Sequence, residues 1–194
     1  AQGEAHASLH MVARFMQNFR LIEEHVPVSH LLAEINAVEN AWDLNQGRQS
    51  KIKVQREEQA IPIRGLRKSK IAGRKRWDVH ESRYTNISQN FPKIRSCLVA
   101  LASKLNGELS RAKVAKLTPG ARVYPHIDRG EYYRVRDRYH LVFDSKPGNV
   151  LKAGDEELWM KPGELWWFDN KAVHAAENAS ASDRVHFIFD LLPL

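Results

Sequence analysis

The sequence contains very little cysteine. Cys97 is the only one among 194 residues, which excludes an internal disulfide and a zinc site built from several cysteines. No run approaches about 18 apolar residues, so we predict no membrane-spanning helix and expect no membrane partner. The first residues lack the basic and apolar pattern of a secretory signal. These absences favour a reducing compartment, and we expect a cytoplasmic location.

Positive charge is abundant but unevenly placed. The formal net charge is +7, and 11 lysines and arginines lie between Arg48 and Trp77 beside only two acids, Glu57 and Glu58. This basic segment, 48–76, would attract a nucleic acid, an anionic head group or an acidic substrate. A solvated loop face explains it equally well, and the signatures of RNA- and DNA-binding domains are absent. Nucleic acid is therefore an alternative partner that the sequence does not favour.

The first half of the chain has helical periodicity. Apolar residues recur every three or four positions in three stretches, which predict helices over 9–25, from Ser29 to about Asp43, and from Pro92 to Leu105. Ser29 is a candidate N-cap, and proline is favoured in a first helical turn. The polar stretch 44–77 predicts short strands or loops. We expect Cys97 to be a small buried apolar side chain and not a nucleophile.

From about residue 111 the pattern changes to short alternating runs separated by Pro-Gly and Gly-Asp turns. It predicts strands at 111–117, 121–125, 132–143, 149–152, 157–160, 164–168, 172–176 and 184–191. Many short strands with regular turns are typical of a β-sandwich or barrel. We therefore expect one domain over 1–194, in which about 1–110 form a helical support with the basic segment and about 111–194 form the β core.

Three residues with metal-ligating side chains stand at the ends of predicted strands. His126 and Asp128 are two apart in Tyr124-Pro125-His126-Ile127-Asp128, and His174 opens a later strand. Residues two apart on a strand point to the same side, so the first two can chelate one ion. Two imidazoles and one carboxylate are the ligand set of non-haem Fe(II) oxygenases. Arg184, ten residues beyond His174, suits a carboxylate such as the distal one of 2-oxoglutarate.

A row of cationic and imidazole side chains follows the His-x-Asp pair. Arg134, Arg136, Arg138 and His140 alternate with other residues and would share one face of a strand. Such a face is either solvated or occupied by carboxylates, because buried cations without anions are costly. We favour carboxylates for Arg138 and His140, the two nearest the apolar run Leu141-Val142-Phe143.

The order of these elements resembles a known family. The residues that carry the resemblance are Pro119-Gly120, Val123-Tyr124-Pro125-His126, Arg138-Tyr139-His140-Leu141, Pro162-Gly163-Glu164, Phe168-Asp169-Asn170, His174 and Arg184. Over roughly 111–192 the chain is similar to the aspartyl/asparaginyl β-hydroxylase family of Fe(II)/2-oxoglutarate-dependent oxygenases. The resemblance implies a double-stranded β-helix, or jelly roll, so the expected fold is mainly β with supporting N-terminal helices.

The resemblance also implies residue roles. Fe(II) would be bound by His126 and His174, with Asp128 completing the triad where vertebrate members have glycine. Arg184 would hold the distal carboxylate of 2-oxoglutarate, and Arg138 and His140 would lie by its other carboxylate. A cosubstrate-binding serine of the vertebrate members aligns with Ala115, so Tyr124 or Thr118 is a candidate partner for Arg184. Residues 129–132 are a candidate substrate-facing loop.

The expected activity is a dioxygenase that uses Fe(II), 2-oxoglutarate and O2 to hydroxylate a substrate. Candidate substrates are an aspartyl or asparaginyl residue, a free amino acid or another small anionic compound, because arginines surround the site. One alternative is the same chemistry on nucleic acid, which would bind with steep salt dependence. The other is a metal-binding jelly-roll module without turnover. Candidate outer-shell partners of the histidines are Asp169, Asn170 and Glu177.

Overall fold

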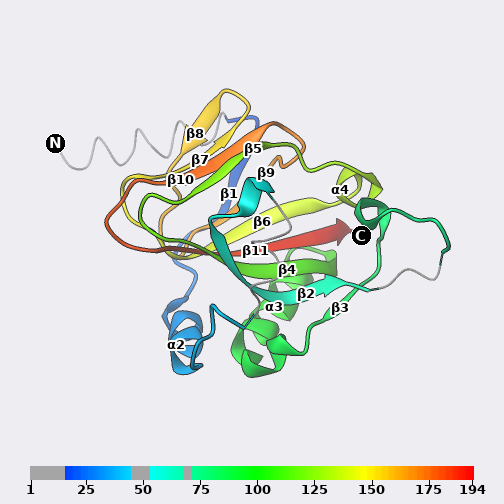
Figure 1. The fold of residues 1–194 in the computed structure, drawn as a ribbon, viewed down its shortest axis with the longest axis horizontal. Coiled ribbons are helices and arrows are strands. Elements are labelled where there is room, and N and C mark those ends of the chain that lie inside the picture. Colours follow the sequence, from blue (N-terminus) through cyan, green and yellow to red (C-terminus); the bar gives the residue numbers. More distant parts are fainter. Residues whose placement is uncertain (1–15, 45–52, 68–70) are drawn as a thin grey trace.

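Two facing antiparallel sheets form the molecule in the computed structural model, which describes residues 16–44, 53–67 and 71–194. The seven-stranded major sheet contains, in spatial order, β1 (Phe19–Glu23), β9 (Leu165–Phe168), β6 (Asp137–Asp144), β11 (Arg184–Pro193), β4 (Gly107–Leu117), β2 (Glu58–Leu66) and β3 (Ser82–Tyr84). The four-stranded minor sheet contains β5 (Arg122–His126), β10 (His174–Asn178), β7 (Asn149–Ala153) and β8 (Glu156–Leu158). From β4 onward the chain passes back and forth between the sheets, as the predicted double-stranded β-helix requires (Figure 1).

Helices cover the outer face of the major sheet. They are α2 (Ser29–Ala37) and α3 (Pro92–Lys104), with the short α4 (Glu131–Arg134) and the 3₁₀ turns η2 (Lys53–Gln55), η3 (Arg76–Asp78) and η4 (Ile87–Asn90) elsewhere. Within the described residues, no helix has the length and apolar content needed to cross a membrane. Helix α3 begins at Pro92 as predicted, and the Glu34 carboxylate of α2 accepts the first free N–H groups of α3 from Lys93 and Ile94 at 2.8 and 3.0 Å.

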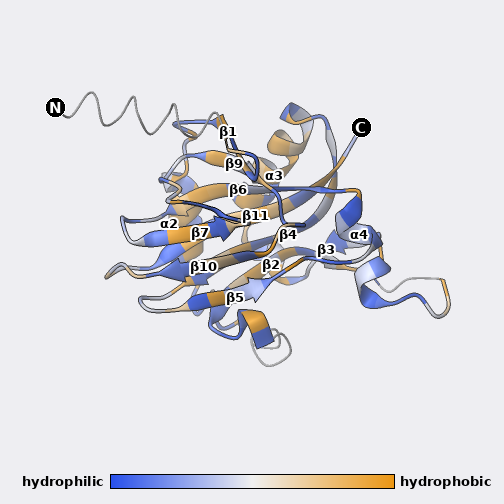
Figure 2. Cartoon of the chain, turned by 90° about the horizontal axis from the view of Figure 1, so that it is seen from above, coloured by the Kyte–Doolittle hydropathy of each residue, from blue (hydrophilic) through white to orange (hydrophobic). Residues whose placement is uncertain are grey.

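Strand β11 is buried on both faces, and the two faces differ in chemistry. Val185, Phe187 and Phe189 pack in the apolar core beneath the helices. On the opposite face, between the two sheets, lie Arg184, His186, Ile188 and Asp190, which are at most 8% exposed. Apolar residues dominate the strands and polar residues the connecting loops (Figure 2). A polar row inside a barrel requires partners, and these partners define the functional site.

The N-terminal prediction was wrong in its described part. Residues 9–15 lie outside the described residues, but 19–23 form strand β1 along β9 and not a helix. Phe19 is fully buried while Arg20 and Ile22 are exposed, which is the period of a strand. The free edge of β9 supplies backbone partners that override the helical spacing. With β2 and β3, the first half of the chain adds three strands to the major sheet.

Other boundaries also differ from the prediction. Ser29 makes no cap hydrogen bond, and α2 ends at Ala37. The predicted strand 132–143 begins only at Asp137, because α4 precedes it. Gly130 has φ +106°, and a Cβ there would lie 2.6 Å from the carbonyl oxygen of Trp77. The chain therefore turns at Gly130 against η3, and the Glu131 N–H bonds to Asp78 at 3.0 Å.

Candidate metal centre and pocket

The three predicted metal ligands meet at one end of the minor sheet. His126 ends β5, His174 begins β10, and the two residues are direct partners in the antiparallel register. Asp128 follows β5 and hydrogen-bonds through its N–H to the Asn170 carbonyl at 3.1 Å. One ligand atom from each of the three residues lies within 4.8 Å of the others, and His126 Nε2 is 3.7 Å from Asp128 Oδ1. This spacing fits a single ion bound on one face.

Backbone carbonyls fix the tautomer of both histidines. His126 Nδ1 lies 2.7 Å from the Tyr124 carbonyl oxygen, and His174 Nδ1 lies 3.0 Å from that of Ala172. A carbonyl only accepts, so each Nδ1 carries the proton and each Nε2 keeps its lone pair. The predicted outer-shell partners Asp169, Asn170 and Glu177 do not hold these rings. Because each partner carbonyl lies two residues before its histidine, the local strand backbone orients the ring.

One oxygen of Asp128 is occupied and the other faces the histidines. Oδ2 accepts a hydrogen bond from Asn170 Nδ2 at 3.0 Å and an ion-paired one from Arg138 Nη1. Oδ1 is the oxygen nearest His126. Burial would raise the pKa of this carboxyl, but Arg138 and, next in size, His174 hold it below its ordinary value. Asp128 is therefore a preformed anion with one oxygen free for a metal.

Arg138 is itself held by a second acid. Its Nε and Nη2 donate to the two oxygens of Asp190 at 2.7 and 3.1 Å, which is a bidentate pair. The Tyr132 hydroxyl donates to Asp190 Oδ2 at 3.0 Å and accepts the Arg111 N–H at 2.8 Å. A chain of buried contacts thus runs from Tyr132 through Asp190 and Arg138 to the metal-ligand carboxylate.

A second series of side-chain contacts begins at Arg184, deeper between the sheets. Arg184 is 2% exposed, and within the described residues it makes no ion pair. Its Nη2 donates to His186 Nδ1 at 3.1 Å. The Nδ1 of His140 lies 3.2 Å from that same Nδ1 of His186. Arginine cannot accept, so His186 Nδ1 accepts and His140 donates. His186 lies in register with Ala115, and it partners Arg184 where the sequence suggested Tyr124 or Thr118.

Burial controls the protonation of Arg184 and of the histidines near it. It lowers the pKa of Arg184 to about 10, an effect that the Glu58 carboxylate partly opposes. Burial first, and then the charge of Arg184, depress the pKa values of His140 and His186 well below the ordinary value. Burial lowers the pKa of His174 to about 4. All three imidazoles are therefore neutral near pH 7, while Arg184 keeps its charge.

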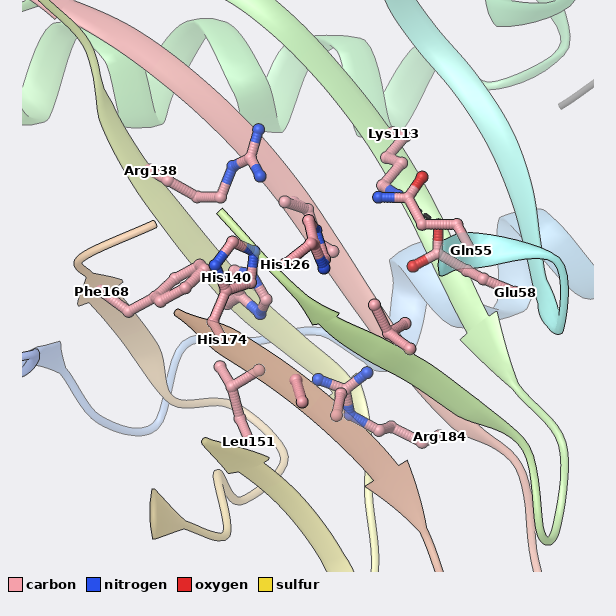
Figure 3. A pocket seen from close by; sticks show the side chains of 14 residues that line it. Gln55, Glu58, Lys113, His126, Arg138, His140, Leu151, Phe168, His174 and Arg184 are labelled. Atoms are coloured by element: carbon pink, nitrogen blue, oxygen red, sulfur yellow. Dashed lines mark hydrogen bonds and ion pairs between the residues drawn. The ribbon is translucent and has the colours of Figure 1, made fainter. Parts of the chain in front are cut away.

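Both series of contacts reach one pocket between the sheets, which Arg138, His140 and Arg184 line (Figure 3). Its lining residues are Gln55, Glu58, Lys113, Val123, His126, Arg138, His140, Leu151, Phe168, His174, Ala175, Ala176, Arg184 and Ile188. The donor set at one end fits a divalent ion such as Fe(II), because two imidazole nitrogens and one carboxylate oxygen are free. The buried guanidinium of Arg184 fits an anion.

The predicted row of cations on the strand was only half right. Arg138 and His140 line the pocket, but Arg134 lies in α4, pairs with Glu131 and is 68% exposed in its side chain. Arg136 precedes β6 and bonds to Ser110 Oγ at 2.7 Å. The alternation fails because the first two residues are not in the strand. Arg138 holds the carboxylates that we expected, whereas His140 contacts a histidine.

Sequence reasoning missed Asp190, Tyr132 and the Glu58–Lys113 pair. Asp190 follows Arg184 at the same strand period, six residues later, so alternation along the last strand could have found it. Tyr132 fell in the predicted substrate-facing loop 129–132 but is fully buried. The described part of the basic segment forms β2 and its neighbours: Arg64, for example, bonds to the Ser110 carbonyl at 2.9 Å.

The fold and the site define a double-stranded β-helix protein with a candidate centre of two histidines and one carboxylate. A family model described as aspartyl/asparaginyl beta-hydroxylase matches residues 32–193. The chain belongs to this family.

Individual relatives share shorter segments. The chain is 33% identical over 89 residues to L-proline cis-3-hydroxylase 1 of a Streptomyces species, which covers 44% of this chain and 31% of the relative. It is 30% identical over 78 residues to L-proline cis-4-hydroxylase of Rhizobium meliloti (strain 1021), over 40% of this chain and 28% of the relative. The chain thus matches less than a third of the length of these relatives.

A solved structure extends the comparison to the whole fold. A prolyl hydroxylase from Trichoplax adhaerens, in complex with a peptide fragment of hypoxia inducible factor, superposes with a TM-score of 0.57 at 15% identity. The match covers 98% of this chain and 92% of that one. At this identity the likeness concerns the double-stranded β-helix alone.

Proposed function

We propose that the protein is an Fe(II)/2-oxoglutarate-dependent hydroxylase. The single observation that carries this proposal is the presence, in one pocket, of a preformed His126–Asp128–His174 site and of the buried cation Arg184, which makes no ion pair within the described residues. A metal-binding module alone would not require the second feature, because a buried cation is costly unless an anion joins it. Membership of the aspartyl/asparaginyl β-hydroxylase family supports the same activity.

In this proposal His126 Nε2, His174 Nε2 and Asp128 Oδ1 hold the metal. Bound Fe(II) with 2-oxoglutarate supplies the oxidative decarboxylation that couples O2 to substrate hydroxylation. The protein contributes ligand geometry. The carbonyls of Tyr124 and Ala172 keep both rings in the binding tautomer, and Arg138 with Asn170 keeps one carboxylate oxygen engaged elsewhere. A metal ion held by these three residues would keep positions open for other ligands.

The cosubstrate would span the pocket from the metal end to Arg184. Arg184 would hold the distal carboxylate, and Arg138 and His140, nearer the metal, would face the other end. His186 orients the guanidinium without adding charge. Apolar side chains such as Leu151, Phe168 and Ile188 line the space between and exclude water, which strengthens the ion pair that forms.

For the substrate we propose a free amino acid. The supporting observation is the sequence likeness to two L-proline hydroxylases from different bacteria. The family name also covers hydroxylation of aspartyl and asparaginyl residues, so free and peptide-linked aspartate and asparagine are the comparison substrates. A panel that contains L-proline, L-aspartate, L-asparagine and short peptides would rank them by substrate-dependent succinate release.

The test is anaerobic titration of Fe(II) and then 2-oxoglutarate into the apoprotein, followed by visible absorption. We expect a metal-to-ligand charge-transfer band that Arg184→Ala weakens and Asp128→Ala abolishes. Iron binding without a band would reject the cosubstrate site and leave a metal-binding module. If the protein forms the band but turns over only with oligonucleotides, and binds them with steep salt dependence, the substrate is a nucleic acid and not an amino acid.

A further inference from the structure

A buried ion pair forms part of the pocket wall and has no role in the site described so far. Glu58 of β2 and Lys113 of β4 are paired, and their side chains are only 4% and 11% exposed. Both line the pocket, on its far side from Phe168 in the close-up view, where Glu58 is drawn nearer to Arg184 than Lys113 is (Figure 3). A buried pair costs about as much in desolvation as it gains by attraction, so its position in a ligand pocket calls for a functional explanation.

Strand register places Glu58 and Arg184 on the same face of the major sheet, one on each side of β4. Both residues are direct partners of Leu117, Glu58 from the β2 side and Arg184 from the β11 side. Residues paired across a sheet share a face, so both side chains project into the pocket from positions two strands, or about 10 Å, apart at Cα. Lys113 lies four residues before Leu117 on β4 and therefore has the same face.

The residues just before Glu58 are held against strand β5. The neighbouring Glu57 accepts the Tyr124 hydroxyl and the Arg122 N–H, the latter at 3.0 Å, and both donors belong to β5. The Arg56 guanidinium stacks on the Tyr124 ring at 4.3 Å. These contacts join the start of β2 to the minor sheet, and the Glu58 side chain is 4% exposed in the pocket between them.

The pair also acts electrostatically on the residues assigned to the cosubstrate. The Glu58 carboxylate favours the charged form of Arg184, and the Lys113 ammonium disfavours protonation of His140. An anion that enters this space therefore meets one negative and two positive groups, Glu58 against Arg184 and Lys113.

We propose that the Glu58–Lys113 pair sets the affinity of this pocket for the distal carboxylate of a 2-oxo dicarboxylate. The Glu58 carboxylate repels a ligand carboxylate bound at Arg184. The Lys113 ammonium reduces this repulsion because it pairs with Glu58. Both residues are specificity-determining residues that act on charge, and this inference rests on the proposed function. Without the charge of Lys113, the pocket would bind the dianion at Arg184 less tightly.

Three variants separate the contributions. Lys113→Met removes the positive charge beside Glu58 and is expected to weaken 2-oxoglutarate binding about tenfold, as a unit charge at this range predicts. Glu58→Gln removes the opposing charge and is expected to tighten binding severalfold. The double variant removes both charges together, so its affinity is expected to return to within about twofold of the parent.

The measurement is the 2-oxoglutarate dissociation constant of the Fe(II)-loaded protein without oxygen, read from the charge-transfer band. 2-Oxopentanoate, which has a methyl group in place of the distal carboxylate, serves as the neutral-tail probe. Its affinity should not change in any of the three variants. The control is the exposed pair Glu23–Lys104, whose matching variants Glu23→Gln and Lys104→Met should leave both affinities unchanged. Circular dichroism and thermal melting show whether each variant is folded.

The outcomes distinguish this inference from the proposed function. If the parent protein forms no band, the proposed function fails. If the parent forms the band but Glu58→Gln binds 2-oxoglutarate no more tightly, the inference is wrong. A double variant as weak as Lys113→Met would also overturn it, since Lys113 would then contact the cosubstrate directly. If the variants changed the dissociation constant of 2-oxopentanoate as much as that of 2-oxoglutarate, the effect would come from pocket shape, and the inference about charge would be wrong.

Discussion

The two ends of the pocket are held in different ways. At the metal end each group has a fixed partner: a backbone carbonyl orients each imidazole, and Arg138 links Asp128 to Asp190. At the other end Arg184 has one hydrogen bond to a neutral histidine and, within the described residues, no carboxylate partner. The metal end is preorganised, whereas the distal end retains a charge that a ligand must match.

This difference has a physical cause. An ion binds well only if its ligands already stand at the right spacing, so the protein fixes them in advance. A buried guanidinium whose charge is not balanced by an acid of the protein gains more from an incoming carboxylate than one already in an ion pair. The comparison therefore predicts that damage at the two ends will have separable consequences, and the following changes would test that separation.

The largest effect is expected at the metal end, from His174→Ala. Loss of an outer-shell partner alone reduces metal affinity or activity by about 10–100-fold, so loss of a ligand should exceed that range. Fe(II) binding by equilibrium dialysis and succinate formation should both fall. The control is His30→Ala, because His30 is exposed on α2. Full turnover in His174→Ala would remove the metal centre from the mechanism.

Arg184→Ala tests the distal end. It should weaken 2-oxoglutarate binding about a hundredfold through loss of a buried, charge-assisted contact, while Fe(II) affinity stays the same. Arg184→Lys should recover only part of the loss, because an ammonium cannot form the two parallel bonds. Arg122→Ala, on the exposed side of β5, is the control. If Arg184→Ala lowered metal affinity as much as cosubstrate affinity, the two ends would not be separable.

Asp190→Asn asks how far the preorganisation at the metal end depends on the second acid. Arg138 would lose the charge of its bidentate partner, and Asp128 would be held less firmly. We expect Fe(II) affinity to fall about tenfold, in the range of outer-shell changes. Tyr132→Phe, which removes one hydrogen bond to Asp190, should have a smaller effect in the same direction. An unchanged metal affinity in Asp190→Asn would show that Asn170 suffices to hold Asp128.

The smallest effect concerns stability and pH. His140 and His186 have pKa values well below the ordinary 6.5, so the unfolded chain binds more protons than the folded protein as pH falls. The metal-free protein should lose stability below about pH 6.5, by at most about 1.4 kcal/mol per pH unit for each histidine. Urea unfolding at pH 7.5 and 5.5 measures this loss. His186→Gln, which cannot titrate but can still accept from Arg184, should reduce the slope, and an unchanged slope would contradict the assignment.

Periodicity predicted the site better than it predicted the N-terminal support. His126 and Asp128 lie together at the end of β5, where the Asn170 carbonyl holds the Asp128 N–H, and His174 joins them because strand order brings β10 beside β5. The helix from Pro92 was also correct, since its start signal is local. The segment around Phe19 was wrong, because the deciding partner, the edge of β9, is almost 150 residues away in sequence.

The sequence by itself determined the strand pattern, the spacing of the candidate ligands and the presence of one arginine after the second histidine. Only the tertiary structure decided which groups meet across strands: Arg138 with Asp190, Arg184 with His186, and Glu58 with Lys113. Alternation tells which face a side chain occupies, but it does not give the register between strands distant in sequence. Burial, which sets the charge of each group, follows from that register.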